Sequence, residues 1–287
     1  MTPRLPAIDL AAALAVVLIW GLNFVAGKLA VTDMPPFLVT TVRFVGVALL
    51  LAPFFRPRRS QLPGLLILAA LLGAGHFGLL FVALRGLDAT ALAVLVQMGP
   101  PFAVLTAWAL QGDRPGGRQL GGIGLALVGV VVIALESERA SLGSVLLAAL
   151  SMALWALSNI QVKRIGALSP LAMNGWMSLM GAPMVLGLSL VFESGQIEAM
   201  ATAGWLAWAG VAFTMLFSSV VAYTLWYRLL ARHPVSRVAP FLLLAPLIGF
   251  SASALFLGEP VSLYKVAGGL LTIAGVAVIE LGGRKKA

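Results

Sequence analysis

The sequence predicts an all-α integral membrane protein with ten transmembrane helices, arranged as two inverted five-helix repeats. Hydrophobic side chains make up 61% of the 287 residues, charged side chains make up 10%, and the mean hydropathy is +1.03. A soluble domain of this length has too little interior to bury so many apolar side chains, so lipid must cover them. The apolar residues also fall into ten blocks, and the two halves of the chain resemble each other.

The ten blocks approach the length of about 20 apolar residues that a helix needs to cross a bilayer core about 30 Å thick. In chain order we expect spans at Ala7–Ala30, Pro36–Phe55, Pro63–Leu84, Thr90–Leu110, Leu120–Leu135, Leu142–Val162, Pro170–Phe192, Gly204–Leu230, Val238–Leu257 and Val266–Leu281. The fifth block rises only about 24 Å, so polar flanks or thinned lipid must complete it. A count of nine spans is therefore an alternative.

The first block is expected to be a permanent span and not a cleaved signal peptide. Asp9 interrupts its start, and the apolar run continues past Trp20, beyond the usual core of a signal peptide. Its similarity to the sixth block also indicates that it belongs to the folded protein.

The basic residues are distributed unequally between the two sides that these spans define. With an even number of spans, fourteen of the 19 Lys and Arg residues lie on the side of the chain ends. They are Arg4, Arg56, Arg58, Arg59, Arg114, Arg118, Lys163, Arg164, Arg228, Arg232, Arg237, Arg284, Lys285 and Lys286. The positive-inside rule therefore predicts that both termini are cytoplasmic.

Composition excludes several other classes of protein and site. A net charge of +9 would suggest a nucleic-acid partner in a soluble protein, but here the basic residues lie in small groups between apolar blocks, beside a lipid bilayer. The absence of cysteine excludes disulfides and Cys-ligated metals. His76 and His233 lie at different depths with no acidic cluster joining them, so we expect no metal site and no cofactor.

The chain contains an internal repeat, with a first half at 1–140 and a second half at 141–287. A constant offset of 146 residues pairs Pro100, Gly112, Asp113, Gly122, Gly129 and Ile133 with Pro246, Gly258, Glu259, Gly268, Gly275 and Ile279. Each half holds five spans, an odd number, so the second half enters the membrane from the opposite side. Inverted repeats give a carrier two equivalent conformations, one open to each side of the membrane.

Four segments resemble those of EamA-type members of the drug/metabolite transporter superfamily. They are "IWGLNFVAGK" in the first span, "PPFLVTTVRF" entering the second, "QGDRP" after the fourth and "LGEP" after the ninth. The resemblance covers essentially the whole chain. It implies a basket-like ten-helix carrier in the bacterial inner membrane, of a family that often exports amino acids or related metabolites.

Polar side chains at the centre of the spans mark a candidate substrate pocket, because such groups are costly in lipid unless they face protein or a cavity. Trp20 and Asn23 share a face of the first helix, and the sixth helix repeats this pattern with Trp155 and Asn159. The alternative is that the amides hold helices together and the Trp rings fill grooves.

Further candidates for the pocket lie on the third, fourth and eighth helices. His76 and Gln97 are polar groups well inside the bilayer, and Tyr223 is placed to form part of the wall. A lone histidine is equally explained as a hydrogen-bonded bridge between helices, as opposed to a proton carrier or ligand contact.

Prolines in the fourth and ninth helices predict breaks in the helical backbone. Pro100 and Pro246 remove backbone donors and leave the carbonyl groups four residues earlier, including that of Val96, without their usual partners. Discontinuous helices near the midplane are how many carriers present polar groups to a substrate. A plain kink, satisfied by a neighbouring helix, is the alternative.

Two basic residues are expected to have structural or gating roles. Arg43 lies roughly 10 Å into the second helix, deep enough to require a partner. Asp33, Asp88 or Glu259 could pair with it as a helix clamp, and binding of a substrate carboxylate is the alternative. Lys28 is expected to extend outward or to attract an anionic group at the outer mouth.

The sequence therefore predicts an inner-membrane carrier that exports small metabolites by alternating access, with amino acids or their derivatives as the leading substrate class. We expect a small-molecule substrate, no enzymatic activity and a monomer. A multidrug or cation exporter and a sugar-type transporter of the same fold are alternatives, but no membrane-buried carboxylate is visible for a cation. An intramembrane hydrolase using Ser251 and His76 lacks a recognisable nucleophile motif.

Overall fold

A computed structural model describes residues 6–112, 114–135, 142–233, 238, 241–242 and 244–283. These residues form helices joined by short connections, and no strand occurs among them. The helices are α1 (Ala7–Asp33), α2 (Pro36–Leu51), η1 (Arg59–Gln61), α3 (Leu62–Leu68), η2 (Ala69–Gly78), α4 (Leu79–Gly86), α5 (Ala89–Leu95), η3 (Val96–Met98), α6 (Gly99–Gln111), α7 (Gly117–Leu135), α8 (Leu142–Ile165), α9 (Pro170–Phe192), α10 (Gln196–Thr202), α11 (Trp205–Phe213), η4 (Thr214–Ala222), α12 (Tyr223–Arg232), α14 (Leu244–Leu257) and α15 (Leu263–Gly283).

Six helical segments among the described residues are long and apolar enough to cross a membrane. They are Ala7–Asp33, Arg59–Gly86, Ala89–Leu110, Leu142–Ile165, Pro170–Phe192 and Trp205–Trp226. Four further apolar helices are shorter, at Pro36–Leu51, Gly117–Ile133, Leu244–Leu257 and Leu263–Ile279. Several long segments change helix type part-way along, with π-helical stretches at η2 and η4 and a 3₁₀ turn at η3.

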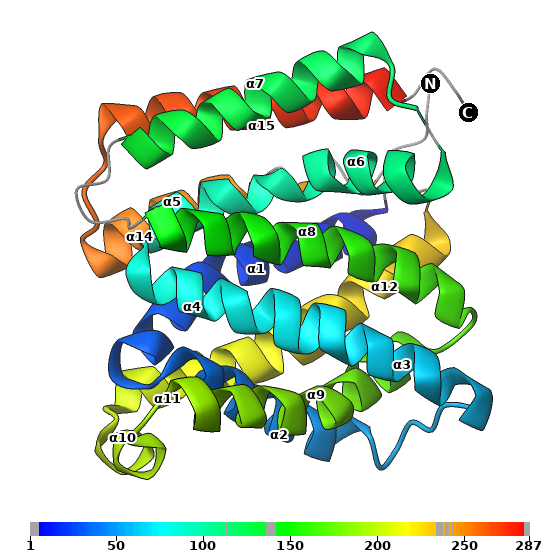
Figure 1. The fold of residues 1–287 in the computed structure, drawn as a ribbon, viewed down its shortest axis with the longest axis vertical. Helices are drawn as coiled ribbons and strands as arrows, with labels where there is room; N and C mark the ends of the chain where they lie inside the picture. The colour runs from blue at the N-terminus through cyan, green and yellow to red at the C-terminus, as the bar shows by residue number, and fades with distance from the viewer. Residues whose placement is uncertain are drawn as a thin grey trace.

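The helices lie side by side in one bundle, as Figure 1 shows. The pair α7 and α15 forms one outer layer, α1 runs through the middle, and α2 and α9 lie toward the opposite edge. The start of α1 and the end of α15 lie at the same end of the bundle, which is also the end where α8 joins α9. We call it the terminal end, and the other the distal end.

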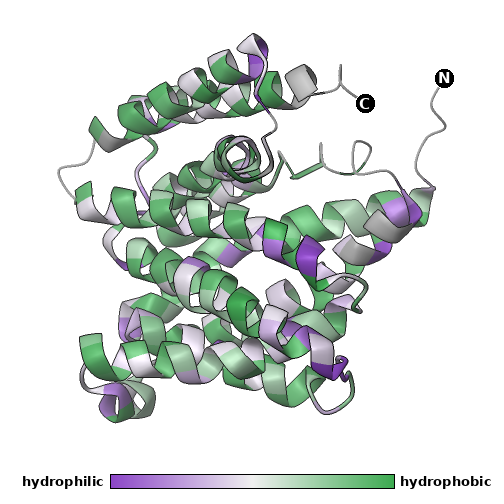
Figure 2. Cartoon of the chain, turned by 45° about the vertical axis from the view of Figure 1, so that its right-hand side comes forward, coloured by the Kyte–Doolittle hydropathy of each residue, from purple (hydrophilic) through white to green (hydrophobic). Residues whose placement is uncertain are grey.

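The outside of the bundle is apolar and the polar residues gather near the helix ends (Figure 2). Large hydrophobic side chains such as Leu49, Leu135, Phe192 and Leu263 are largely exposed. Their number greatly exceeds what a water-soluble surface carries in contiguous patches, so the helix faces that bear them require lipid.

Glycines allow α7 and α15 to pack backbone against backbone. A Cβ atom added to Gly122 would lie 2.7 Å from the carbonyl oxygen of Gly275, and one added to Gly268 would lie 2.6 Å from that of Gly129. The offset that relates the two halves exchanges these two contacts, as a local two-fold axis between the helices would. Gly122, Gly268 and Gly275 are thus close-packed against the facing helix, whereas Gly121 has open space around it.

Gly112 and Gly258, which the offset of 146 residues pairs, each follow the end of a helix. Gly112 follows α6 and Gly258 follows α14, and their φ angles of +75° and +65° lie in the left-handed region that favours glycine. The acidic residue after Gly112, Asp113, lies outside the described residues.

Replacing Gly122 with leucine should lower the thermal stability of the detergent-solubilised protein, because the new side chain meets the backbone of α15. Overpacking of this kind costs about 1–3 kcal/mol. Gly124→Leu on the same helix is the matched control, since no described atom lies within 4 Å of a Cβ there. Equal melting temperatures for the two variants would contradict the close packing.

Candidate functional site

Arg43 is a charged residue in the interior of the bundle. It lies in the middle of α2 and 1% of its surface is exposed. Its Nε donates a hydrogen bond to Ser219 Oγ over 2.9 Å, and its guanidinium carbon lies 4.3 Å from the centre of the Phe77 ring. Its Nη1 atom is buried without a hydrogen-bond partner among the described residues. Because a buried charge is costly unless it is paired, this environment is incomplete.

Ser219 connects Arg43 to two other helices. Its hydroxyl donates to the carbonyl of Thr214, five residues earlier in the π-helical segment η4, while accepting from Arg43. Its own carbonyl accepts a hydrogen bond from Asn174 Nδ2 of α9 over 2.6 Å. The guanidinium is therefore held in one position by α2, α9 and η4 together.

Two π-helical segments border this site, one from each half of the chain. The offset of 146 residues places the equivalent of η2 at 215–224, close to the observed η4 at Thr214–Ala222. π-Helical turns are rare and occur frequently at functional sites, because they widen the helix and redirect side chains. Phe77 comes from η2 and Ser219 from η4, so both segments contact the guanidinium of Arg43.

A small cavity lies beside the guanidinium, with a volume of about 30 Å³. This volume is enough for about two water molecules. Its lining residues are Arg43, Phe44, Leu68, Leu72, Phe77, Val162, Pro170, Met173, Asn174, Met177, Ser219 and Tyr223. Val162 lies near the end of α8 and Pro170 begins α9, so the cavity extends toward the terminal end of the bundle.

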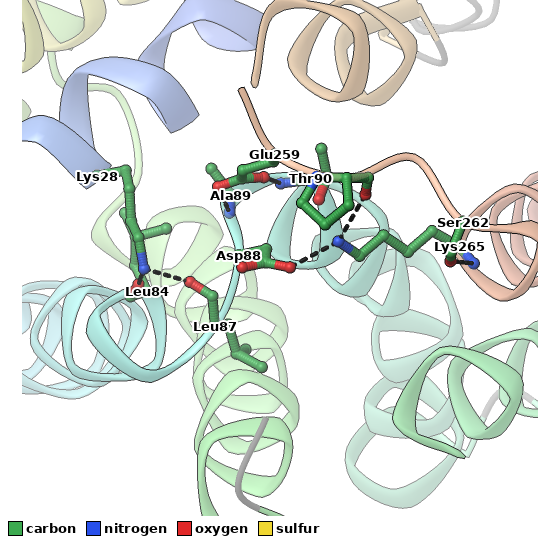
Figure 3. A network of polar contacts seen from close by, with 10 residues as sticks. Lys28, Leu84, Leu87, Asp88, Ala89, Thr90, Glu259, Ser262 and Lys265 are labelled. Carbon is green, nitrogen blue, oxygen red and sulfur yellow. Dashed lines mark hydrogen bonds and ion pairs between the residues drawn. The ribbon is translucent and has the colours of Figure 1, made fainter. Parts of the chain in front are cut away.

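The distal end of the bundle is held together by a network of polar contacts (Figure 3). Lys28 Nζ of α1 donates to the carbonyls of Leu84 and Leu87 over 2.8 and 2.6 Å, where α4 ends. Glu259 accepts from the backbone N–H groups of Ala89 and Thr90, which begin α5, over 2.7 and 2.8 Å. Lys28 thus fixes the connection between α4 and α5 to α1, and Glu259 fixes it to the other half of the chain.

An ion pair and two further carboxylates complete this end. Lys265 Nζ of α15 lies 2.6 Å from Asp88 Oδ2. Glu193 accepts from the N–H groups of Phe37 and Leu38 at the start of α2 over 2.7 and 3.1 Å, and Asp33 accepts from Gly204 at the start of α11. A carboxylate is stabilised at a helix N-terminus because it satisfies unpaired N–H groups and the positive end of the helix dipole.

The predicted pocket residues fall into two groups, defined by ring contacts or by their positions on helices that pack together. In the first, the ring of Trp20 lies 5.3 Å from that of Tyr223 and 5.9 Å from that of Trp226. Asn23 lies one turn further along α1, and its Oδ1 is buried with no hydrogen-bond partner in the described chain. Pro246 lies on α14, which packs against α1.

The second group surrounds the break in the fourth predicted span. The ring of Trp155 packs on Gly99, since a Cβ atom added to Gly99 would lie 3.0 Å from that ring. Gly99 directly precedes Pro100 and lies two residues after Gln97. His76 Nδ1 lies 2.9 Å from Ser151 Oγ, so this histidine bridges η2 and α8. Asn159 lies two turns beyond Ser151 on α8. Tyr223 and Arg43 line the cavity, whereas the remaining predicted pocket residues do not.

The prolines lie beside helix breaks in both halves, but Val96 does not lose its partner as predicted. The 3₁₀ turn η3 precedes Pro100, and within it the N–H of Gly99 binds the carbonyl of Val96. A short 3₁₀ turn at 241–242 occupies the equivalent place before Pro246, which lies in the first turn of α14. Tightening of the backbone thus compensates for the donor that Pro100 lacks.

Comparisons with known proteins agree with this architecture. The sequence pattern of the EamA-like transporter family matches residues 8–135 and again 142–281. The chain belongs to the EamA-like transporter family. Proteins from Salmonella typhimurium and Escherichia coli, each named "Probable amino-acid metabolite efflux pump", are 30% and 31% identical to it and align over 95% and 94% of this chain and 94% of their own. A solved crystal structure with 18% sequence identity superposes with a TM-score of 0.65, covering 97% of this chain and 99% of the other, and it shows the fold alone.

This EamA-like transporter is accordingly a multi-pass membrane protein. The family name and the names of its relatives describe transport and no catalytic activity. The two matched segments coincide with the two halves that the internal repeat defines, to within a few residues at each end.

The structure of this EamA-like transporter corrects the predicted partners of Arg43 and Glu259. Asp33, Asp88 and Glu259 bind other groups at the distal end, whereas Arg43 binds Ser219 and Phe77. Glu259 was expected to pair with a base, but it binds peptide N–H groups, because the start of α5 offers two unpaired donors.

The side chain of Lys28 extends to the distal end of the bundle. Its ammonium group turns to the carbonyls that end α4, where the negative end of the helix dipole attracts a cation.

Sequence reasoning missed Ser219 and Asn174. Neither residue is unusual in a membrane helix, and the π-helical turn that directs Ser219 toward Arg43 has no known sequence signature. One sequence feature could have indicated Ser219: the adjacent hydroxyl residues Ser218 and Ser219 lie in the middle of an apolar span of the second half, whereas Arg43 lies inside a span of the first half.

Glu259→Gln should loosen the distal end, because a neutral amide cannot accept from two N–H groups as strongly as a carboxylate. The chain has no cysteine, so Thr90→Cys provides a single, fully buried thiol beside this contact. In membrane vesicles we expect labelling by a membrane-impermeant maleimide from the distal side to rise about tenfold in the Glu259→Gln background.

The matched control is Glu198→Gln, since Glu198 is exposed at the same end of the bundle. The double variant Thr90→Cys, Glu198→Gln should be labelled at the same rate as Thr90→Cys alone. Unchanged labelling in the Glu259→Gln background would contradict the closing role of this contact.

Proposed function

We propose that this EamA-like transporter exports small metabolites, with amino acids or their derivatives as the substrate class, across a bacterial inner membrane by alternating access. The observation that carries the proposal is the end-to-end similarity to two proteins named as amino-acid metabolite efflux pumps. The absence of Asp and Glu from the described residues that line the cavity favours such solutes over organic cations.

The proposed transport unit is a monomer of two inverted five-helix repeats, 1–140 and 141–287. In this arrangement the six long and four shorter apolar helices are the ten spans, and both termini are cytoplasmic. The reciprocal glycine contacts of α7 and α15 and the equivalent π-helical segments support the inverted symmetry. Inverted repeats favour alternating access, because exchanging the shapes of the halves exchanges the open side.

The present conformation fits the loading stage of an exporter. Polar contacts hold the distal end closed, whereas the cavity extends toward the terminal end, which this proposal places in the cytoplasm. A substrate would enter from the cytoplasm, and the distal contacts would separate to release it. We propose that Trp20, Asn23, Trp155, Asn159, Gln97 and Tyr223 line its path, beside the helix breaks at Pro100 and Pro246.

Proteoliposomes loaded with a mixture of labelled amino acids, sugars and cationic dyes test this function. We expect efflux of amino acids at rates well above those of protein-free liposomes, with little movement of dyes. Robust movement of dyes without any amino acid would overturn the proposed substrate class. Liposomes containing protein denatured before reconstitution control for leakage.

Asn23→Leu should reduce amino-acid efflux about tenfold while leaving the melting temperature within a few degrees of the original. The unpartnered Oδ1 contributes no hydrogen bond to the described structure, so its loss acts mainly on the substrate. Thr32→Ala is the control on the same helix, because Thr32 is exposed and binds only the carbonyl of Lys28. Normal efflux by Asn23→Leu would show that the predicted path is misplaced.

A further inference from the structure

We propose that Arg43 is the binding group for the carboxylate of the transported solute, and that the solute's side chain is apolar. This inference rests on the proposed function and specifies its substrate class. Arg43 lines the cavity beside Ser219 and Asn174, and the described chain supplies no counter-ion for it there.

The charge of Arg43 is left unbalanced by the surrounding protein. The described carboxylates that could have paired with it are committed elsewhere: Asp33 and Glu193 to helix N-termini, Asp88 to Lys265, and Glu259 to α5. A guanidinium carries five N–H donors, of which Nε binds Ser219 and those of Nη1 have no partner in the described residues. An anion that enters the cavity would supply both the missing charge and the missing acceptor.

The guanidinium is already positioned for this role. The bond to Ser219 and the face of Phe77 hold it in place without using Nη1. Carboxylates bind guanidinium groups through short, charge-assisted hydrogen bonds, and these are strongest where water is excluded. A fixed donor also loses little conformational entropy when the ligand binds.

The size and lining of the cavity specify the rest of the solute. At about 30 Å³ it has room for about two waters, and hence for a carboxylate group but not for a whole amino acid. The neighbouring wall consists of Leu68, Leu72, Met173 and Met177, and the two flexible methionines can move aside for an apolar group. No acidic side chain is present among the described lining residues to pair with a cationic side chain.

Binding measurements with leucine and phenylalanine, each compared with its own amide, test the inference. The amides keep the apolar side chain and remove the carboxylate. With the purified full chain in detergent, we expect the amino acids to bind about tenfold or more tightly than the amides. In Arg43→Gln this preference should fall to within twofold, whereas Arg56→Gln, at the exposed end of the same span, should retain it.

A second variant decides the matter if Arg43→Gln does not fold. Asn174→Asp is nearly isosteric and places a permanent carboxylate in the same cavity, where it neutralises Arg43 and repels a second anion. This variant loses the hydrogen bond from Asn174 to the Ser219 carbonyl but gains an ion pair with Arg43. We therefore expect it to fold with a melting temperature within a few degrees of the original and to lose the preference for the amino acids over their amides.

The possible results separate this inference from the proposed function. An original protein that binds neither leucine nor phenylalanine would overturn the inference, and amino-acid efflux from the mixed proteoliposomes would still support the function. A preference that persists in Arg43→Gln or in Asn174→Asp would also overturn it. Loss of the preference in both variants, with Arg56→Gln unchanged, would support it.

Discussion

The buried guanidinium of Arg43 is the interaction on which the account of this protein depends. Removing a charge from water costs several kcal/mol, and a single hydroxyl and a ring face do not fully replace the lost hydration. Soluble proteins rarely leave such a group without a carboxylate. We propose that the missing partner is the transported solute, because a site that binds and releases a solute must be incomplete when the solute is absent.

The rest of the fold positions this group and controls access to it. The π-helical segments η2 and η4 bring Phe77 and Ser219 to the guanidinium from opposite halves of the chain. At the distal end, carboxylates bind the first N–H groups of α2, α5 and α11, and Lys28 binds the last carbonyls of α4. These contacts join helix ends across the bundle beside a buried apolar cluster that includes Met34, Leu84, Leu87 and Ala89, so opening this end must separate apolar as well as polar groups.

The sequence predicted the features that depend on composition and spacing. Apolar blocks indicated the membrane helices, and the constant offset paired Gly122 with Gly268 and Gly112 with Gly258, which have equivalent places in the structure. The depth of Arg43 followed from counting residues along α2. Its partners could not be predicted, because they depend on a π-helical turn in η4 and on which helix N-termini compete for Glu259. Both are set by tertiary packing, which spacing along one chain does not reveal.

The central claim is that the two ends of the bundle open in alternation around this site. Two pairs of spin labels, on Arg85 and Leu263 at the distal end and on Ser60 and Arg228 at the terminal end, would report it, since all four residues are exposed and the chain has no cysteine of its own. In liposomes with and without leucine, we expect the distal distance to lengthen in the molecules whose terminal distance shortens. Distances that change together, or a terminal distance that never shortens, would contradict alternating access.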